Sequence, residues 1–207
     1  MKALMLSSGS SINTPAIFET HFDAKLRKMR VAYIKNATDT VPGGFDRNYI
    51  SNTIERWVKF IDIIDLYESA KVDWDNYDVI WVGGGLMLPL HKAVFETGFN
   101  EQLPELLSEG MMYVGSSAGA MIASSTQKVC GWYPDEEELE IITRSGLGWL
   151  PFEIFPHYDE SAHKDLIQKS STDPIILLPD NSAIGIDRNE LRFYNQARLL
   201  IQDSSPR

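Results

Sequence analysis

Short apolar runs alternate along the chain with longer segments that mix apolar and polar positions. The apolar runs have the length of buried strands, whereas several mixed segments repeat an apolar residue every three or four positions, as helices packed on a sheet do. This alternation predicts an α/β fold in which helices cover a mostly parallel sheet. The expected strands in the first part of the chain are residues 3–7, 30–34, 77–82 and 111–115.

Helices are expected between these strands. Residues 46–61 carry apolar side chains at helical spacing, with Asp46 placed as the N-cap. The apolar face of this expected helix consists of Ile50, Ile54, Trp57, Val58 and Ile61. The other expected helices are residues 100–108, a segment that begins at Ala118, and residues 160–170.

The carboxyl-terminal part of the chain has a different pattern. Short strand-like pieces are separated by the turn signals Asp180-Asn181 and Arg188-Asn189. These pieces are residues 175–178, 183–186, 191–194 and 199–202. Because no internal repeat or linker interrupts the sequence, we expect one domain over residues 1–207, a three-layer α/β sandwich with a β-rich carboxyl end.

Composition and charge narrow the range of partners. The 207 residues are 43% hydrophobic and 23% charged, as in ordinary globular proteins. The formal net charge is −10, and residues 104–207 alone hold 16 acidic against 8 basic groups. This acidic excess repels phosphate backbones and anionic lipids, and no cluster of Lys and Arg overrides it. We therefore expect a small-molecule partner, and neither nucleic acid nor a membrane.

Cysteine use and the amino terminus bear on location and cofactors. Cys130 is the only cysteine, so it can form no intramolecular disulfide, and a lone Cys is not a zinc or redox motif. The first apolar run is too short for a signal peptide, and no segment approaches the ~20 apolar residues of a membrane span. The expectation is a cytoplasmic protein with no metal and no cofactor. No oligomeric state follows from the sequence.

A candidate nucleophile stands between an expected strand and an expected helix. Gly115-Ser116-Ser117-Ala118-Gly119 matches the Gly-x-Ser-x-Gly pattern of a nucleophile elbow, in which small flanking residues allow a strained turn. Ser117 is the central serine, and Ser116 is out of register. The backbone N–H of Ala118 is a candidate oxyanion donor, because the first N–H groups of a helix have no intrahelical partner. A tight turn of small residues would match the same five positions.

A second glycine-rich loop, Gly83-Gly84-Gly85, follows another expected strand. Without side chains its backbone can approach a ligand closely, so Gly84 or Gly85 is a candidate for a second oxyanion donor. A flexible turn between a strand and a helix is the alternative. Neither glycine loop has the Gly-x-Gly-x-x-Gly spacing of a dinucleotide site.

A serine nucleophile needs a base, and His157 is the best candidate of the four histidines. It follows Phe155-Pro156 and an apolar run, so we expect it at a strand end with a restricted backbone. His21, His91 and His163 are expected to be surface residues.

Taken together and in this order, four segments resemble the aspartyl dipeptidase (peptidase E) and cyanophycinase family of serine peptidases. They are the triple glycine 83–85, the elbow 115–120, the segment Phe155-Pro156-His157-Tyr158 and the segment Leu178 to Ile184. The resemblance implies a class I glutamine amidotransferase-like (flavodoxin-like) fold and peptide hydrolysis through an acyl-enzyme. It also implies no metal.

The resemblance implies a role for each matching residue. Ser117 would attack the peptide carbonyl, His157 would act as base and then as acid, and Ala118 with Gly84 or Gly85 would hold the oxyanion. Asp180 is the preferred orienting acid and Asp135 the alternative. Asp159 stands at the acid position of the amidotransferases. Asn181 replaces a family glycine at a position that still permits a left-handed turn.

Two other functions compete with a peptidase of small peptides. One is an esterase or acyl hydrolase of the α/β-hydrolase kind, whose order of serine, acid and histidine Ser117, Asp135 and His157 would satisfy. The other is a binding protein of the same fold that has lost turnover. Arg144, Lys164 and Arg188 are available to bind a substrate carboxylate, but none lies in a matching motif.

Overall fold

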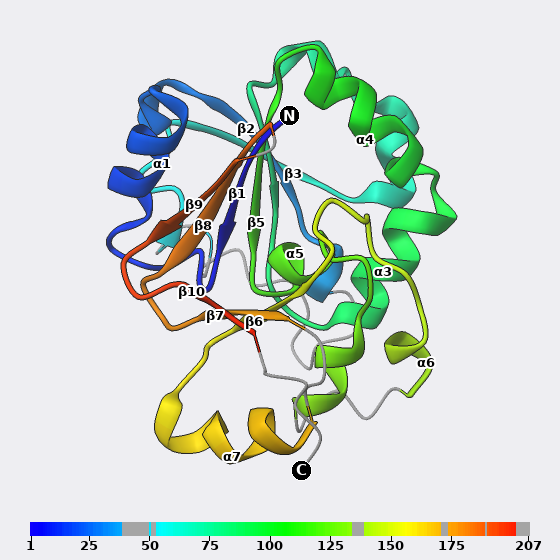
Figure 1. Ribbon diagram of the computed structural model, residues 1–207. Helices are drawn as coiled ribbons and strands as arrows, with labels where there is room; N and C mark the ends of the chain where they lie inside the picture. The colour runs from blue at the N-terminus through cyan, green and yellow to red at the C-terminus, as the bar shows by residue number, and fades with distance from the viewer. Residues whose placement is uncertain (39–49, 51–52, 134–138, 171–173, 189, 202–207) are drawn as a thin grey trace.

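The computed structural model describes residues 1–38, 50, 53–133, 139–170, 174–188 and 190–201. Its strands are β1 (Lys2–Leu6), β2 (Arg30–Ile34), β3 (Phe60–Ile64), β4 (Val79–Val82), β5 (Met112–Ser116), β6 (Glu153–Pro156), β7 (Ile175–Leu178), β8 (Ala183–Asp187), β9 (Glu190–Tyr194) and β10 (Arg198–Leu200). Seven of them form the central sheet, in the order β3-β2-β4-β5-β1-β8-β9 (Figure 1). The first five strands in this order are parallel, so the predicted α/β fold with a mostly parallel sheet is confirmed.

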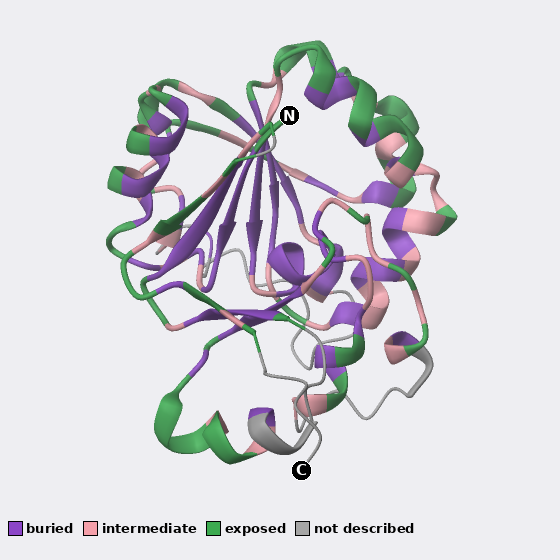
Figure 2. Ribbon diagram, viewed as in Figure 1, coloured by how far each residue is buried: buried purple, intermediate pink, exposed green. Residues whose placement is uncertain are grey.

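Helices lie on both faces of the central sheet (Figure 1). They are α1 (Thr14–Phe22), α3 (Met87–Glu96), α4 (Phe99–Ser108), α5 (Ala118–Met121), α6 (Leu139–Ile142) and α7 (Glu160–Ser170). Short 3₁₀ helices are η1 (Leu26–Lys28), η2 (Asn36–Thr38), η3 (Leu66–Lys71), η4 (Trp74–Asn76) and η5 (Lys128–Trp132). Successive side chains of a strand point to opposite faces, so Leu4 packs in the core on the α1 side and Met5 in the core with α3, α4 and α5. The middle strands are therefore buried on both faces (Figure 2).

The helix predicted over residues 46–61 is wrong at its carboxyl-terminal end. Residues 46–49 and 51–52, with the expected N-cap Asp46, lie outside the described residues. Ile50 and Ile54 do pack together in the core beside α1, but residues 54–57 form a turn and residues 60–61 belong to β3. β3 pairs in parallel with β2, and its isoleucines favour an extended backbone, so sheet pairing overrides the helical spacing.

The carboxyl-terminal strands are divided between two sheets. β8 and β9 extend the central sheet as antiparallel strands, and β8 pairs directly with β1. β6, β7 and β10 form a separate three-stranded sheet in which β6 and β7 are parallel. The additional strands at the carboxyl end are thus confirmed. Because the chain passes from β7 of the small sheet to β8 of the large one, residues 179–182 lie where the two sheets meet.

Candidate active site

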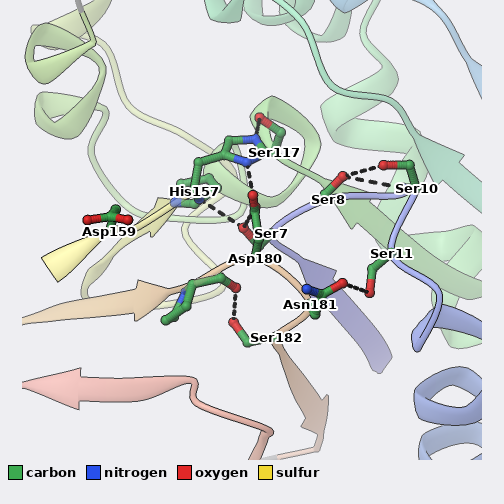
Figure 3. Close-up of polar contacts among 12 residues, drawn as sticks. Ser7, Ser8, Ser10, Ser11, Ser117, His157, Asp159, Asp180, Asn181 and Ser182 are labelled. Atoms are coloured by element: carbon green, nitrogen blue, oxygen red, sulfur yellow. Dashed lines mark hydrogen bonds and ion pairs between the residues drawn. The ribbon is translucent and has the colours of Figure 1, made fainter. Parts of the chain in front are cut away.

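The site lies where the carboxyl ends of strands from both sheets come together. β1 and β5 pair with Leu6 opposite Ser116, so the residues that follow them, Ser7 and Ser117, leave the sheet side by side. In the small sheet Pro156 is opposite Leu178, which brings the residues after β6 and β7 together in the same way. Polar side chains separated by more than 170 residues of sequence, such as those of Ser7 and Asp180, therefore meet in one place (Figure 3).

Ser117 occupies a strained turn between β5 and α5. Its φ of 50° and ψ of −113° lie outside the regions that residues with a side chain favour. The flanking glycines are required by close packing, because a Cβ on Gly115 would lie 2.1 Å from the carbonyl oxygen of Gly119. Ser116, the residue out of register, is buried and accepts a hydrogen bond from Trp81 Nε1 at 2.7 Å. Of the two neighbouring serines, only Ser117 has its hydroxyl directed toward His157.

Ser117, His157 and Asp180 form a continuous hydrogen-bonded series (Figure 3). Nε2 of His157 lies 3.1 Å from Oγ of Ser117, and Nδ1 of the same ring lies 2.8 Å from Oδ1 of Asp180. A carboxylate only accepts hydrogen bonds, so in the neutral ring Nδ1 carries the proton and Nε2 accepts from the serine hydroxyl. The His157 side chain is 42% exposed, so a substrate can reach it.

The backbone of His157 is held in a left-handed conformation, with φ of 54°. Its N–H donates to Oγ of Ser7 at 2.8 Å, and the next N–H, of Tyr158, donates to the carbonyl of Leu178 at 3.0 Å. Tyr133 donates its hydroxyl to the carbonyl of Pro156 at 2.7 Å. These bonds tie the end of β6 to three other parts of the chain, which fixes the direction of the imidazole.

The triple glycine loop lies against the serine. A Cβ on Gly84 would be 3.0 Å from Cβ of Ser117, and Gly85 has a φ of +142°, which residues with a side chain rarely adopt. A Cβ on Gly85 would also lie 2.2 Å from the carbonyl oxygen of Ala37. Gly85 is therefore required by its backbone conformation and by the space beside Ala37, and a side chain at position 84 would force Ser117 to shift by a few tenths of an ångström. The N–H of Ala118 is at the first position of α5, where no intrahelical acceptor exists.

Of the acids considered from the sequence, the structure places Asp180 at the imidazole. Asp159 instead accepts hydrogen bonds from the Ser161 hydroxyl and from the N–H groups of Ser161 and Ala162, at the start of α7. These bonds, led by the one from the Ser161 hydroxyl, lower the pKa of Asp159. Asp135 lies outside the described residues. The order along the chain is therefore serine, histidine, acid, which differs from the α/β-hydrolase order.

The surface locations expected for the other histidines are wrong in two cases. His21 on α1 and His91 on α3 are buried, with 2% and 4% of their surface exposed. His21 bonds Tyr194 and the carbonyl of Ile186, and His91 Nε2 lies 2.9 Å from the carbonyl oxygen of Ser145. Their amphipathic helices turn these polar rings inward, where each has a hydrogen-bond acceptor. His163 is partly exposed and accepts the N–H of Asp159 through Nδ1.

Ser7 is the site residue that the sequence did not single out. Its hydroxyl bonds both the backbone of His157 and the carboxylate of Asp180. One signal was available, since Ser7 directly follows the first buried strand and the carboxyl ends of parallel strands share one edge of a sheet. Asn181 behaves as expected, with a left-handed φ of 66°.

Two of the three basic residues considered for binding a substrate carboxylate are not available beside Ser117. Arg188 lies away from Ser117, and Lys164 is paired with an acidic residue. Arg188 donates its N–H to the carbonyl of Met1, at the amino end of β1 and therefore at the opposite edge of the sheet. Lys164 lies 3.7 Å from Glu160, one turn away on α7. No group of three or more His, Cys, Asp or Glu side chains within the described ranges could hold a metal ion. Among the helices that the structure describes, none is long and apolar enough to span a bilayer.

An α/β sheet that presents a serine on a strained strand-to-helix turn, hydrogen-bonded to a histidine that bonds a carboxylate, defines a protein of the serine hydrolase class. Within the serine hydrolases, the family of this chain is identified by a family model that matches most of its length. The chain belongs to peptidase family S51, whose model matches residues 3–194.

Curated relatives of this chain include two proteins named Peptidase E. The chain is 30% identical to Peptidase E of Nostoc sp. (strain PCC 7120) over 150 residues, which are 70% of this chain and 58% of that relative. It is 30% identical to Peptidase E of Streptomyces coelicolor over 164 residues, which are 71% of this chain and 66% of that relative. The chain thus spans less than two thirds of the length of either relative.

Two solved structures share the fold. A crystal structure of a candidate peptidase E from Listeria monocytogenes EGD-e superposes with a TM-score of 0.73 at 20% identity, over 93% of this chain and 96% of that one. A peptidase from an acI-B1 actinobacterium superposes with a TM-score of 0.59 at 16% identity, over 98% of this chain and 95% of that one. At these identities the likeness concerns the fold alone.

Proposed function

We propose that the protein is a serine peptidase that hydrolyses small peptides through an acyl-enzyme on Ser117. The observation that carries the proposal is the unbroken series of Ser117 Oγ, the His157 imidazole and the Asp180 carboxylate, with contacts of 3.1 and 2.8 Å. Membership of peptidase family S51 supports peptides as the substrate class. The single buried cysteine supports a cytoplasmic setting for this activity.

The proposed mechanism follows from which atom each group presents. Nε2 of His157 takes the proton of Ser117 while Oγ attacks the peptide carbonyl carbon, and the carbonyl oxygen becomes an oxyanion. The N–H groups of Ala118 and of Gly84 or Gly85 stabilise that oxyanion. The imidazolium then protonates the leaving amine, which departs and leaves the acyl-enzyme.

Deacylation repeats these steps with water. His157 takes a proton from a water molecule that attacks the acyl carbon, and returns it to Ser117 Oγ as the acid product leaves. Asp180 holds the ring in this orientation and stabilises its cation. A pocket of about 310 Å³ adjoins His157 and Asp180, lined by residues that include Tyr158, Gln196 and Arg198. Ser117 is not among the residues that line this pocket, so the pocket borders the imidazole and the carboxylate and does not enclose the nucleophile.

Labelling with a fluorophosphonate, followed by peptide mapping and assay on a dipeptide and acyl-ester library, tests the proposal. We expect label on Ser117, cleavage of dipeptides, and loss of both in Ser117→Ala. Ser116→Ala is the matched control, because it removes the neighbouring hydroxyl, which faces Trp81 rather than His157. Label in Ser117→Ala equal to wild type would overturn the assignment of the nucleophile. Preference for esters over every peptide would overturn the substrate class.

A further inference from the structure

Ser7 is a buried residue at the junction of three segments that are distant in sequence. It directly follows β1, and none of its surface is exposed. Its backbone N–H donates to the carbonyl of Ser182 at 3.2 Å, so the residue is anchored to the turn that carries Asp180. Its side chain points toward His157 and Asp180 (Figure 3).

The Ser7 hydroxyl makes two hydrogen bonds, one with the His157 backbone and one with the Asp180 carboxylate. It accepts the N–H of His157 at 2.8 Å, and its single hydrogen is donated to Oδ1 of Asp180 at 3.1 Å. The same carboxylate oxygen accepts Nδ1–H of His157. Ser7 thus links the backbone of the histidine to the carboxylate that holds the ring, through one atom.

This link matters because burial holds neither the His157 nor the Asp180 side chain in place. The Asp180 side chain is 65% exposed, so few packing contacts restrict its rotation. The His157 backbone has a left-handed φ, which costs free energy unless neighbouring contacts hold it. A buried hydroxyl bonded to both supplies the restraint that exposed side chains lack, and it holds Oδ1 at the position where it can accept from Nδ1.

We propose that Ser7 is a positioning residue for the catalytic histidine, acting through the Asp180 carboxylate and the His157 backbone without touching the substrate. The inference rests on the proposed serine peptidase function. It predicts that Ser7 affects turnover and the tautomer of the imidazole more than it affects substrate binding.

The kinetic test compares Ser7→Ala, Ser7→Thr and Ser11→Ala. Ser11 is the matched control, because its buried hydroxyl bonds the side chain of Asn181, beside Asp180, and neither His157 nor Asp180. Loss of one hydrogen bond to a charged group corresponds to a decrease of about 10- to 100-fold in kcat for Ser7→Ala, with KM changed less than about threefold. Ser7→Thr restores the hydroxyl and is expected to recover most of kcat. Ser11→Ala is expected to stay within about threefold of wild type.

A double-mutant cycle separates a positioning role from general loss of structure. In an Asp180→Ala background, Ser7→Ala should lower kcat by a much smaller factor than it does in the wild type. The same factor in both backgrounds would overturn the inference, as would a kcat for Ser7→Ala within about threefold of wild type. The cycle does not use Ser7→Thr, so it tests the positioning role even if that variant fails to fold. Thermal melting shows whether it folds.

Nitrogen NMR of histidine-labelled protein gives a readout that is independent of turnover. At a pH where the ring is neutral, wild type is expected to show His157 with its proton on Nδ1, and Ser7→Ala a mixture that includes the Nε2–H tautomer. Retention of the pure Nδ1–H tautomer in Ser7→Ala would overturn the inference. If Ser117 is not labelled in wild type, the peptidase function fails, and the tautomer still decides the role of Ser7.

Discussion

Two histidines of this protein each have a partner at both ring nitrogens, yet their surroundings are opposite. His157 lies at the rim of the site between a serine hydroxyl and a carboxylate, with 42% of its side chain exposed. His21 is buried between α1 and β8, where Nδ1 lies 3.1 Å from the Tyr194 hydroxyl and Nε2 lies 3.3 Å from the carbonyl oxygen of Ile186.

The acceptors set opposite tautomers in the two rings. A carbonyl and a carboxylate only accept, so the neutral His21 carries its proton on Nε2 and the neutral His157 on Nδ1. Burial lowers the pKa of His21, and no carboxylate bonds its ring to stabilise a cation. Two equally satisfied imidazoles thus have different chemistry, because only His157 combines an ionised partner with access to a hydroxyl and to solvent.

The largest expected effect comes from replacing each ring in turn. His157→Gln removes the proposed base, and we expect kcat to fall about 10⁴-fold with little change in the free energy of unfolding. His21→Gln is expected to leave kcat within about threefold of wild type and to lower stability instead. Steady-state kinetics and urea unfolding of both variants check this contrast. Comparable losses of kcat in the two would refute it.

The next effect concerns the acid that distinguishes His157 from His21. Asp180→Asn keeps the shape of the side chain and removes its charge, so we expect kcat to fall about 10³-fold while folding survives. Asp135→Asn and Asp159→Asn serve as parallel variants and are expected to retain kcat within about threefold. Kinetic constants measured at one pH decide among the three acids. A larger loss in Asp135→Asn would transfer the orienting role to that residue.

The packing around His21 gives a stability prediction. A Cβ on Gly185 would lie 2.3 Å from Nδ1 of His21, so Gly185→Ala forces the ring or β8 to move. We expect Gly185→Ala to lower the free energy of unfolding by about 2 kcal/mol, in the range of overpacked cores. His21→Ala makes room for the methyl group, so the double variant should lose less than the sum of the two single losses. Additive losses would show that the strain lies elsewhere.

The smallest expected effect is a pH dependence of stability due to His21. Because its pKa is lowered in the folded protein, the unfolded chain binds a proton at pH values where the folded protein does not. The free energy of unfolding should therefore fall as the pH drops below the unfolded value of about 6.5, because the unfolded chain takes up a proton at this residue. Urea unfolding at pH 7.5 and 5.5 should show a smaller fall in His21→Gln. An equal fall in both proteins would exclude His21 as its source.

Much of the fold follows from local patterns in the sequence. The buried strands β1, β2, β4 and β5 were predicted to within one or two residues, because runs of apolar residues of that length are buried on both faces of a parallel sheet. The spacing of apolar residues does not predict α1, and it predicts the end of a helix where β3 begins. β3 is an edge strand whose burial alternates, and its spacing of apolar residues fits either structure until β2 pairs with it.

The local sequence is enough to identify Ser117 as the candidate nucleophile, because the elbow needs small residues at fixed positions around it. Contacts between distant segments bring Asp180 to His157, place Ser7 between them and bury His21. These contacts depend on the register of β6 with β7 and on β8 pairing with β1. They connect residues as far as 173 positions apart, such as Ser7 with Asp180, and the hydrophobic pattern within one strand does not specify which strand will lie beside it.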